Sequence, residues 1–294
     1  MSYSKIRRAS HSGSWYSASS KQLNIQLEDW LSKAEVDNTS VRALIAPHAG
    51  YSYSGACAAH AYKQVNPEHI KRVFILGPSH HVSLSGCALT QTHTYETPLY
   101  NLQVDLDMIN ELAATNMFDV MNIQADEDEH SLELHLPYIA KVMESRRDRF
   151  KIVPVLVGST NVESEKNFGK LFSRYLNDPE NLFVISSDFC HWGQRFRYTY
   201  HDRSKGEPYQ SIEHIDKLGM DLIENFDATG FYQYLKRYTN TICGRHPIGI
   251  FLNMVQNLPE GEMSFKFHCY AQSNKCRSSN DSSVSYAAGT FSMK

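Results

Sequence analysis

The stretch "RVFILGPSHH", from Arg72 to His81, has the pattern of a buried strand that ends in two adjacent histidines. Val73 to Leu76 are all apolar, without the alternation of a half-exposed strand, which is typical of a strand covered on both faces. Gly77 and Pro78 then stop the run. Such strands belong to parallel sheets, whose ligands bind beyond the carboxyl ends of the strands. The two imidazoles therefore lie where a binding site is expected.

Further segments of the chain repeat this pattern and place helices between the strands. The other apolar runs are Val41 to Tyr51, Phe150 to Thr160 and Asn181 to Gly193. The segments with helical periodicity are Leu23 to Leu31, Leu132 to Met143, Phe168 to Leu176, Ser211 to Phe226 and Arg245 to Leu258. Strands separated by helices predict an α/β fold with a central mixed, largely parallel sheet flanked by helices.

The end of the chain has a different pattern. Met263 to Gln272 and Ser282 to Met293 alternate more, so we expect them to add antiparallel edge strands. Ser273 to Ser283 is polar and predicts a loop between them. Because no repeat or linker interrupts the chain, we expect residues 1–294 to form a single domain.

Composition narrows the function classes. The chain has 41% hydrophobic and 21% charged residues, a net charge of −3 and a pI near 6.5, so it lacks the basic surplus of a nucleic-acid-binding protein. No segment has the pattern of a signal peptide or is long enough to span a bilayer, so we expect no membrane insertion and a location in the cytoplasm or the nucleus. The six cysteines form no C-x-x-C pair and are expected to be free thiols.

The residues that follow the predicted strands can carry chemistry. His48 follows the first strand, His80 and His81 follow the second, and Asp188 and His191 follow the last. A single histidine in such a loop is more often a hydrogen-bonded loop residue than a ligand. Three strand ends that bring imidazoles and a carboxylate to one edge of a sheet favour a functional site.

Two other segments can supply partners. In "DEDEHSLELHLPY", His135 can point into the pocket, whereas Asp126 to Asp128 are expected to form a solvated face. In "NTICGRHPIG", Cys243 precedes a probable helix, a setting that can lower the pKa of a thiol and yield a thiolate. Cys190 is expected to be inert packing.

Aromatic residues accompany these groups. "SGSWY" and "GYSYSG" combine aromatic and small polar residues in turn-like contexts, so Trp15 and Tyr53 are candidates to line a cleft for an aromatic or peptide ligand. Trp192 is another candidate, whereas Phe196 is expected to pack in the core.

The residue types favour an open metal site. Two histidines with one anionic ligand suit iron, copper or zinc and leave coordination positions free. A closed structural zinc site would use four ligands, often in the C-x-x-C spacing that is missing here. A Cys-His hydrolase with Cys243 or Cys190 as nucleophile is the metal-free alternative, although no motif marks an oxyanion hole.

Seven motifs together resemble one known family. They are "HSGSWY", "IAPHAGYSYSG", "FILGPSHH", "EDEHSLELHLPY", "SSDFCHWGQRFRY", "TICGRHPIG" and "DSSVSYAAG", in this order from His11 to Ala288. They resemble the Memo family (mediator of ErbB-driven cell motility). The resemblance implies a fold similar to the class III, non-haem-iron extradiol dioxygenases.

The resemblance also implies a metal site and the roles of its residues. The ligands would be His48, His80 and Cys243, and Asp188 and His191 would line the same pocket. His191 would stand where the dioxygenases have an acid/base histidine. The pocket would further include Trp15, Tyr53, His81 and His135.

For the Memo family, the resemblance implies copper as the metal, with Fe(II) as the second choice. A soft thiolate in place of the carboxylate of the dioxygenases shifts the preference toward Cu(I). The first hypothesis is therefore a copper- or iron-dependent redox protein, whether or not an enzyme, that acts with dioxygen or a small redox partner. The alternative is a non-enzymatic adaptor that binds a phosphotyrosine peptide of a receptor or adaptor through Trp15, Tyr53 and His191. A ring-cleaving dioxygenase is the weakest hypothesis.

Overall fold

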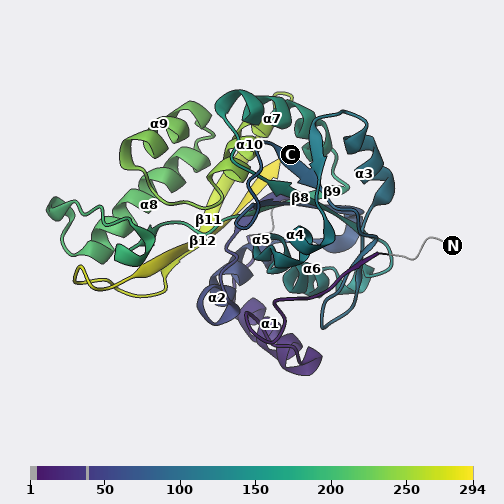
Figure 1. Ribbon diagram of the computed structural model, residues 1–294, viewed down its shortest axis with the longest axis horizontal. Helices are drawn as coiled ribbons and strands as arrows, with labels where there is room; N and C mark the ends of the chain where they lie inside the picture. Colours follow the sequence, from purple (N-terminus) through teal and green to yellow (C-terminus); the bar gives the residue numbers. More distant parts are fainter. Residues whose placement is uncertain (1–4, 38–39, 294) are drawn as a thin grey trace.

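The computed structural model describes residues 5–37 and 40–293 and is built around one large mixed sheet (Figure 1). Its centre consists of four parallel neighbouring strands. In spatial order they are β2 (Val41–Ala46), β9 (Asn181–Ser186), β3 (Arg72–Pro78) and β8 (Lys151–Val157). Their apolar runs are buried almost throughout, as the lack of alternation predicted. The predicted mixed, largely parallel sheet is confirmed.

Antiparallel strands extend the sheet on both sides. On one side, β12 (Ser283–Met293) pairs with β2, and β11 (Met263–Gln272) and β10 (His191–Trp192) pair with β12. On the other side, β4 (Cys87–Leu89) is antiparallel to β8, and β7 (Phe118–Val120) is parallel to β4. The antiparallel terminal strands are confirmed, but β12 is not an edge strand, because it lies between β2 and β11. A small separate sheet contains β1 (Ile6–Arg7), β5 (Thr94–Tyr95) and β6 (Leu102–Gln103).

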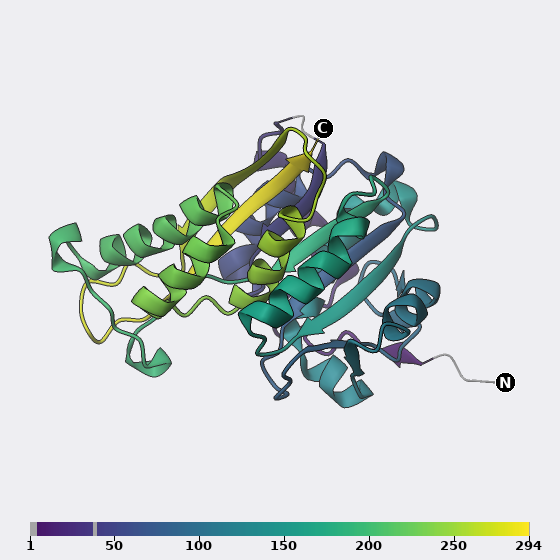
Figure 2. The same ribbon diagram turned by 90° about the horizontal axis from the view of Figure 1, so that it is seen from above.

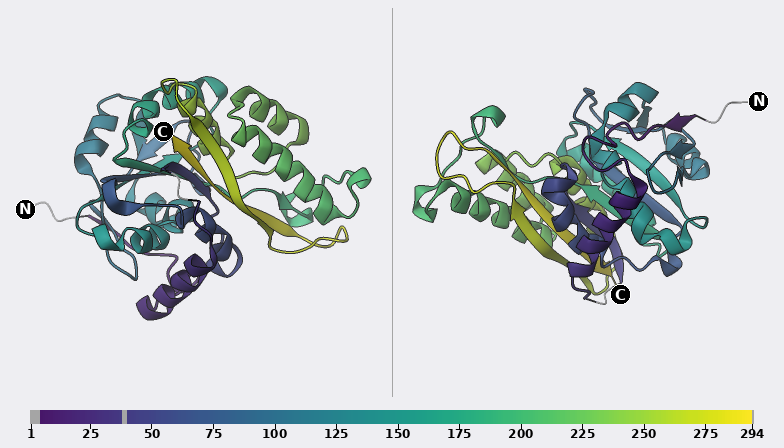
Figure 3. Two further views of the ribbon diagram at one scale, coloured as in Figure 1. Left: turned by 180° about the vertical axis from the view of Figure 1, so that it is seen from behind. Right: turned by 90° about the horizontal axis from the view of Figure 1, so that it is seen from below.

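Helices cover both faces of the large sheet. On the face seen in Figure 2 lie α7 (Val162–Leu176), α8 (Pro208–Glu224), α9 (Ala228–Tyr238) and α10 (Arg245–Val255). On the opposite face, seen from below in Figure 3, lie α1 (Ser20–Lys33) and α2 (Tyr51–Tyr62). The remaining helices are α3 (Leu106–Ala113), α4 (Ile123–Asp128), α5 (His130–Glu133) and α6 (Leu136–Val142). Among the described residues, no helix combines the length and hydropathy needed to cross a bilayer.

Two local predictions are wrong. The segment "GYSYSG" is not a turn, since Tyr51 and Tyr53 belong to the first turn of α2. Small residues in this helix allow α1 to approach closely, and a Cβ atom at Gly55 would lie only 2.3 Å from the ring of Trp30. The single helix expected from Leu132 to Met143 is divided into α5 and α6. Pro137 lies in the first turn of α6 and supplies no backbone N–H, so the hydrogen bond to the carbonyl of Glu133 that would join the two helices is missing.

The acidic run before α5 is the third difference. We expected Asp126 to Asp128 to be solvated, but Asp126 and Glu127 are buried and only Asp128 is exposed. The reason is Arg7, whose side chain is fully buried in β1. Its guanidinium donates to Glu133 Oε2 at 2.5 Å, to Asp126 Oδ1 at 3.3 Å and to the backbone oxygen of Asp126 at 2.9 Å. The N-terminal segment is thereby fixed to the α4–α5 region.

Replacing Arg7 tests this buried cluster. We expect Arg7→Met to lower the free energy of unfolding by about 3–5 kcal/mol, because it leaves the carboxylates of Asp126 and Glu133 buried without their cation. The neighbouring Arg8 pairs with Glu127 at 2.7 Å, but its side chain is 74% exposed and the pair is screened by solvent, so Arg8→Met should lower the free energy of unfolding far less than Arg7→Met. Urea unfolding measures the free energy of unfolding of both variants. Equal decreases would contradict the conclusion that Arg7 is the buried partner of these carboxylates.

Candidate metal centre

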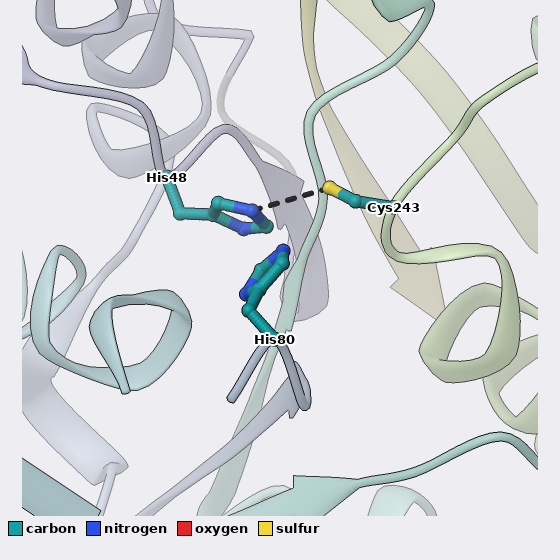
Figure 4. A group of neighbouring side chains, drawn as sticks. All are labelled: His48, His80 and Cys243. Carbon is teal, nitrogen blue, oxygen red and sulfur yellow. Dashed lines mark hydrogen bonds between the residues drawn. The ribbon is translucent and has the colours of Figure 1, made fainter. Parts of the chain in front are cut away.

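Three parallel strands each contribute one residue to the site from the same position beyond their carboxyl ends. His48, His80 and Asp188 each lie two residues beyond the end of a parallel strand, after β2, β3 and β9 respectively. Cys243 comes from the turn before α10 and lies beside them. One ligand atom each from His48, His80 and Cys243 lies within 4.8 Å of the other two (Figure 4). The structure thus brings together the three residues predicted as ligands.

The ring of His48 is held in the orientation that a ligand needs. Its Nδ1 lies 2.6 Å from Ser186 Oγ, and this hydroxyl already donates to the backbone oxygen of Ser131 at 2.7 Å. His48 Nδ1 must therefore carry the proton, which leaves the lone pair on Nε2, 3.1 Å from Cys243 Sγ. Burial, followed by the neighbouring imidazole of His80, lowers the pKa of His48 well below its usual range. The ring is neutral, which is the form that binds metals.

His80 is oriented by a carboxylate that the sequence analysis did not select. Glu129 Oε1 lies 2.8 Å from His80 Nδ1, and Oε2 accepts from the backbone N–H of His80 at 2.7 Å. Burial would raise the pKa of Glu129, but these hydrogen bonds and the His80 charge lower it to about 2. The carboxylate is ionised and fixes the proton on Nδ1, so His80 Nε2 is free to coordinate.

The pKa of the Cys243 thiol is shifted in the direction opposite to the one we expected. Burial, followed by the charge of Asp188, raises the pKa of Cys243 well above its usual range, although a backbone N–H of Asp188 lies 3.2 Å from the sulfur. We expected the helix start to lower the pKa of Cys243. Desolvation of the thiolate dominates instead and raises it. A cation beside the sulfur would stabilise the thiolate. Two imidazoles whose Nε2 atoms have, among the described residues, no protein partner other than the sulfur, and a thiol that needs a cation to ionise, fit a bound metal ion.

Asp188 and His191, which were predicted to line the same pocket, adjoin these three. Asp188 Oδ1 accepts from the backbone N–H groups of His48 and Ala49 at 2.9 and 3.3 Å, so this carboxylate fixes the loop after β2. Burial raises the pKa of Asp188. His191 Nδ1 lies 2.9 Å from the backbone oxygen of Phe189, which places the proton there and leaves Nε2 as an acceptor.

A cavity of about 510 Å³ opens onto the centre. Its lining includes Trp15 and Tyr53, as predicted, but also His130, the loop residue Ser273 and Ser283, the first residue of β12. The other lining residues are His48, Ala49, His80, Asp188, His191, Arg195, Phe196, Asn274, Ser282, Val284 and Tyr286. The core position predicted for Phe196 is therefore wrong, because the chain turns outward after β10.

His130 is the main residue that the sequence analysis missed. Its ring stacks on His80 at 4.3 Å between centroids and packs at a tilt against Trp15 at 4.5 Å. It also belongs to a second group of potential ligands, with His80 and Glu129. The motif "EDEHSLELHLPY" contains both Glu129 and His130, but nothing in the motif indicates which of its two histidines faces the strand ends.

His81, His135 and Trp192 are not among the residues that line this cavity. His81 is exposed, with its ring centroid 6.0 Å from that of His130. His135 is buried, with Nδ1 2.8 Å from the hydroxyl of Tyr62, because the break between α5 and α6 places it against α2. Trp192 is buried and donates to the backbone oxygen of Tyr200. Cys190 is fully buried, in agreement with a packing role.

The buried histidines predict a pH dependence. Burial lowers the pKa of His135 to about 3, below the 6.5 of an unfolded chain. Between these values only the unfolded state binds the proton, so His135 reduces stability as the pH falls below 6.5, by about 1.4 kcal/mol per pH unit. In the presence of a chelator, His135→Gln should remove this contribution from the slope of unfolding free energy between pH 6 and 4. Identical slopes for the two proteins would show that His135 is not buried in its neutral form.

Comparisons with known proteins agree with this geometry. The sequence model of the Memo family, described as "Memo-like protein", matches residues 7–290. "Protein MEMO1" of rat and of human are each 61% identical over 289 residues, covering 98% of this chain and 97% of theirs. "Protein memo-1 homolog" of Caenorhabditis elegans is 51% identical and covers 97% of this chain and 82% of its own.

Among solved structures, an uncharacterized protein of Escherichia coli K12, JW3007, aligns over 83% of this chain and 98% of its own, with 11% identity and a TM-score of 0.49. This likeness is too weak to carry an argument. The family model covers almost the whole chain, and its range contains the positions of the three candidate ligands. The chain belongs to the Memo family.

Proposed function

We propose that this protein binds one copper ion, as Cu(I), through His48, His80 and Cys243, with Fe(II) as the second candidate. The observation that carries the proposal is the convergence of two preoriented Nε2 atoms and one sulfur atom within 4.8 Å. The bound ion would serve redox chemistry with dioxygen or a small redox partner, or would protect the cell from such chemistry.

The donor set favours a soft ion. Thiolate and imidazole together suit Cu(I), whereas the facial set of non-haem iron enzymes has a carboxylate in the third position. The nearby carboxylates are already engaged: Glu129 holds His80, and Asp188 holds the backbone after β2. A two-histidine, one-carboxylate site built from His80, Glu129 and His130 would have to give up these hydrogen bonds. The ring-cleaving dioxygenase is therefore the weaker hypothesis.

Protein groups around the ion would handle protons. A bound copper ion would supply one-electron transfer at the centre. His191 lines the same cavity, and because its Nδ1 donates to a backbone oxygen, its Nε2 is the atom that could accept or return a proton there. Asp188, whose pKa is raised by burial, keeps His48 in place through the backbone. Cys243 is itself oxidisable, so a redox role would require that it be protected by coordination.

Metal titration tests this function directly. Anaerobic titration of the apo-protein with Cu(I), scored by stoichiometry, should give tight one-to-one binding that Cys243→Ser weakens by 100-fold or more, since the soft ligand is lost. Cys190→Ser, at a buried cysteine outside the cavity, is the matched control and should bind like the wild type. Binding of neither Cu(I) nor Fe(II), or binding indifferent to Cys243, would reject the proposal.

A second candidate function has an observation of its own. Arg195 lines the cavity, stacks over the ring of Phe196 at 4.5 Å and shares the cavity with the exposed side chains of Tyr53 and Trp15. A guanidinium can bind a phosphate through two hydrogen bonds, and the aromatic rings can pack on a tyrosine ring. This arrangement supports an adaptor that binds phosphotyrosine peptides.

Calorimetry with a phosphotyrosine peptide tests the adaptor function. Arg195→Gln should weaken binding at least tenfold, because a charged hydrogen bond to phosphate is lost. Arg197→Gln is the control, since Arg197 is exposed in the same segment but does not line the cavity. Peptide binding that is absent, or equal in all three proteins, would exclude this use of the cavity.

A further inference from the structure

A second cavity, of about 560 Å³, lies away from the metal centre. It is formed by α7, α9 and α10, and α10 packs against both other helices (Figure 1). It shares no lining residue with the cavity at the metal centre. Its volume lies in the range of about 300–1,000 Å³ that is typical of small-molecule sites.

The floor of this helix cavity is apolar. Phe231 is buried at its base, and the partly buried side chains of Val162 and Leu235 add aliphatic surface. Tyr232 stands at the rim with 52% of its surface exposed. A ligand with a hydrophobic or aromatic body would cover this surface, and its burial would supply binding free energy.

The rim is positively charged. Lys166 on α7, Lys236 on α9 and Arg245 on α10 line the cavity, and all three are exposed. Within the described part of the chain, none of the three forms an ion pair. The carboxylate among the lining residues, Glu165, is engaged by His246 Nδ1 at 2.8 Å and by the Thr160 hydroxyl at 3.1 Å. Three cations are thus left without a counter-charge on a chain whose net charge is −3.

We propose that the helix cavity binds a small amphipathic anion, namely a compound with an aromatic or short alkyl body and one carboxylate, phosphate or sulfonate group. The apolar floor would take the body, and the cations on the three helices would take the anionic group. Arg245 offers two parallel N–H donors to such a group, and the lysines add point charges. The proposal does not depend on a metal at the other site.

Fluorescence of two matched dyes tests the proposal on the full-length protein. 1-Anilinonaphthalene-8-sulfonate carries an aromatic body and one negative charge, and N-phenyl-1-naphthylamine has the same body without the charge. We expect saturable binding of the sulfonate at least tenfold tighter than binding of the neutral amine. Equal affinities, or no saturable binding of the sulfonate, would overturn the proposal.

Variants locate the binding site. Lys236→Gln/Arg245→Gln should weaken binding of the sulfonate at least tenfold while the thermal unfolding temperature stays the same, because both side chains are exposed. Lys21→Gln, at an exposed lysine on α1, should have no effect, and His48→Ala should have none either. If Arg195→Gln abolishes binding and the double variant does not, the dye occupies the cavity at the metal centre and the proposal is wrong.

Competition identifies the anionic group. Phenyl phosphate and benzoate share an aromatic body and differ in the charged group, so the one that displaces the dye at lower concentration defines the class of the natural ligand. Displacement that is lost in Lys236→Gln/Arg245→Gln would support the site. Displacement of the same strength in that variant and in the wild type would overturn it.

Discussion

The direction of four parallel strands is the constraint on which the site depends. Because β2, β9, β3 and β8 run the same way, the chain must leave each of them at one edge of the sheet. His48, His80 and Asp188 follow their strands at the same distance, two residues after the last strand position. The backbone hydrogen bonds of the sheet thus set the spacing between residues that are far apart in sequence.

The second requirement of the site is that the rings of His48 and His80 direct Nε2, and not Nδ1, toward the metal position. Ser186 and Glu129 accomplish this for His48 and His80 by occupying Nδ1 in each ring. Both partners are themselves fixed, the serine by the backbone oxygen of Ser131 and the glutamate by the backbone N–H of the same residue. Burying these polar groups costs free energy unless every one is hydrogen-bonded. The result is a centre in which both imidazole rings have a fixed orientation. Its unfavourable feature is the buried thiol, whose negative form requires a cation.

The sequence was sufficient for the parallel strands and for placing His48, His80 and Asp188 at one edge of the sheet, because both follow from local pattern. Apolar runs identify the parallel strands, and the residues after them follow from the geometry of such a sheet. It was insufficient where a partner lies far away in the chain. Asp126 looked solvated because its partner, Arg7, is 119 residues distant and lies in a segment without a clear pattern. The same holds for His130, whose ring stacks against His80, a residue at a distant strand end.

Cys243 shows how a residue outside the strands becomes part of the same edge. It is 55 residues from Asp188 in sequence, yet the backbone N–H of Asp188 lies 3.2 Å from its sulfur. The next residue, Gly244, packs so closely on the end of β9 that a Cβ atom there would lie 2.4 Å from the backbone oxygen of Ser186. Its N–H also donates to the Ser187 hydroxyl at 3.1 Å. The turn before α10 is therefore docked on the same strand end that supplies Asp188, and the sulfur is positioned by the sheet as firmly as the two imidazoles are.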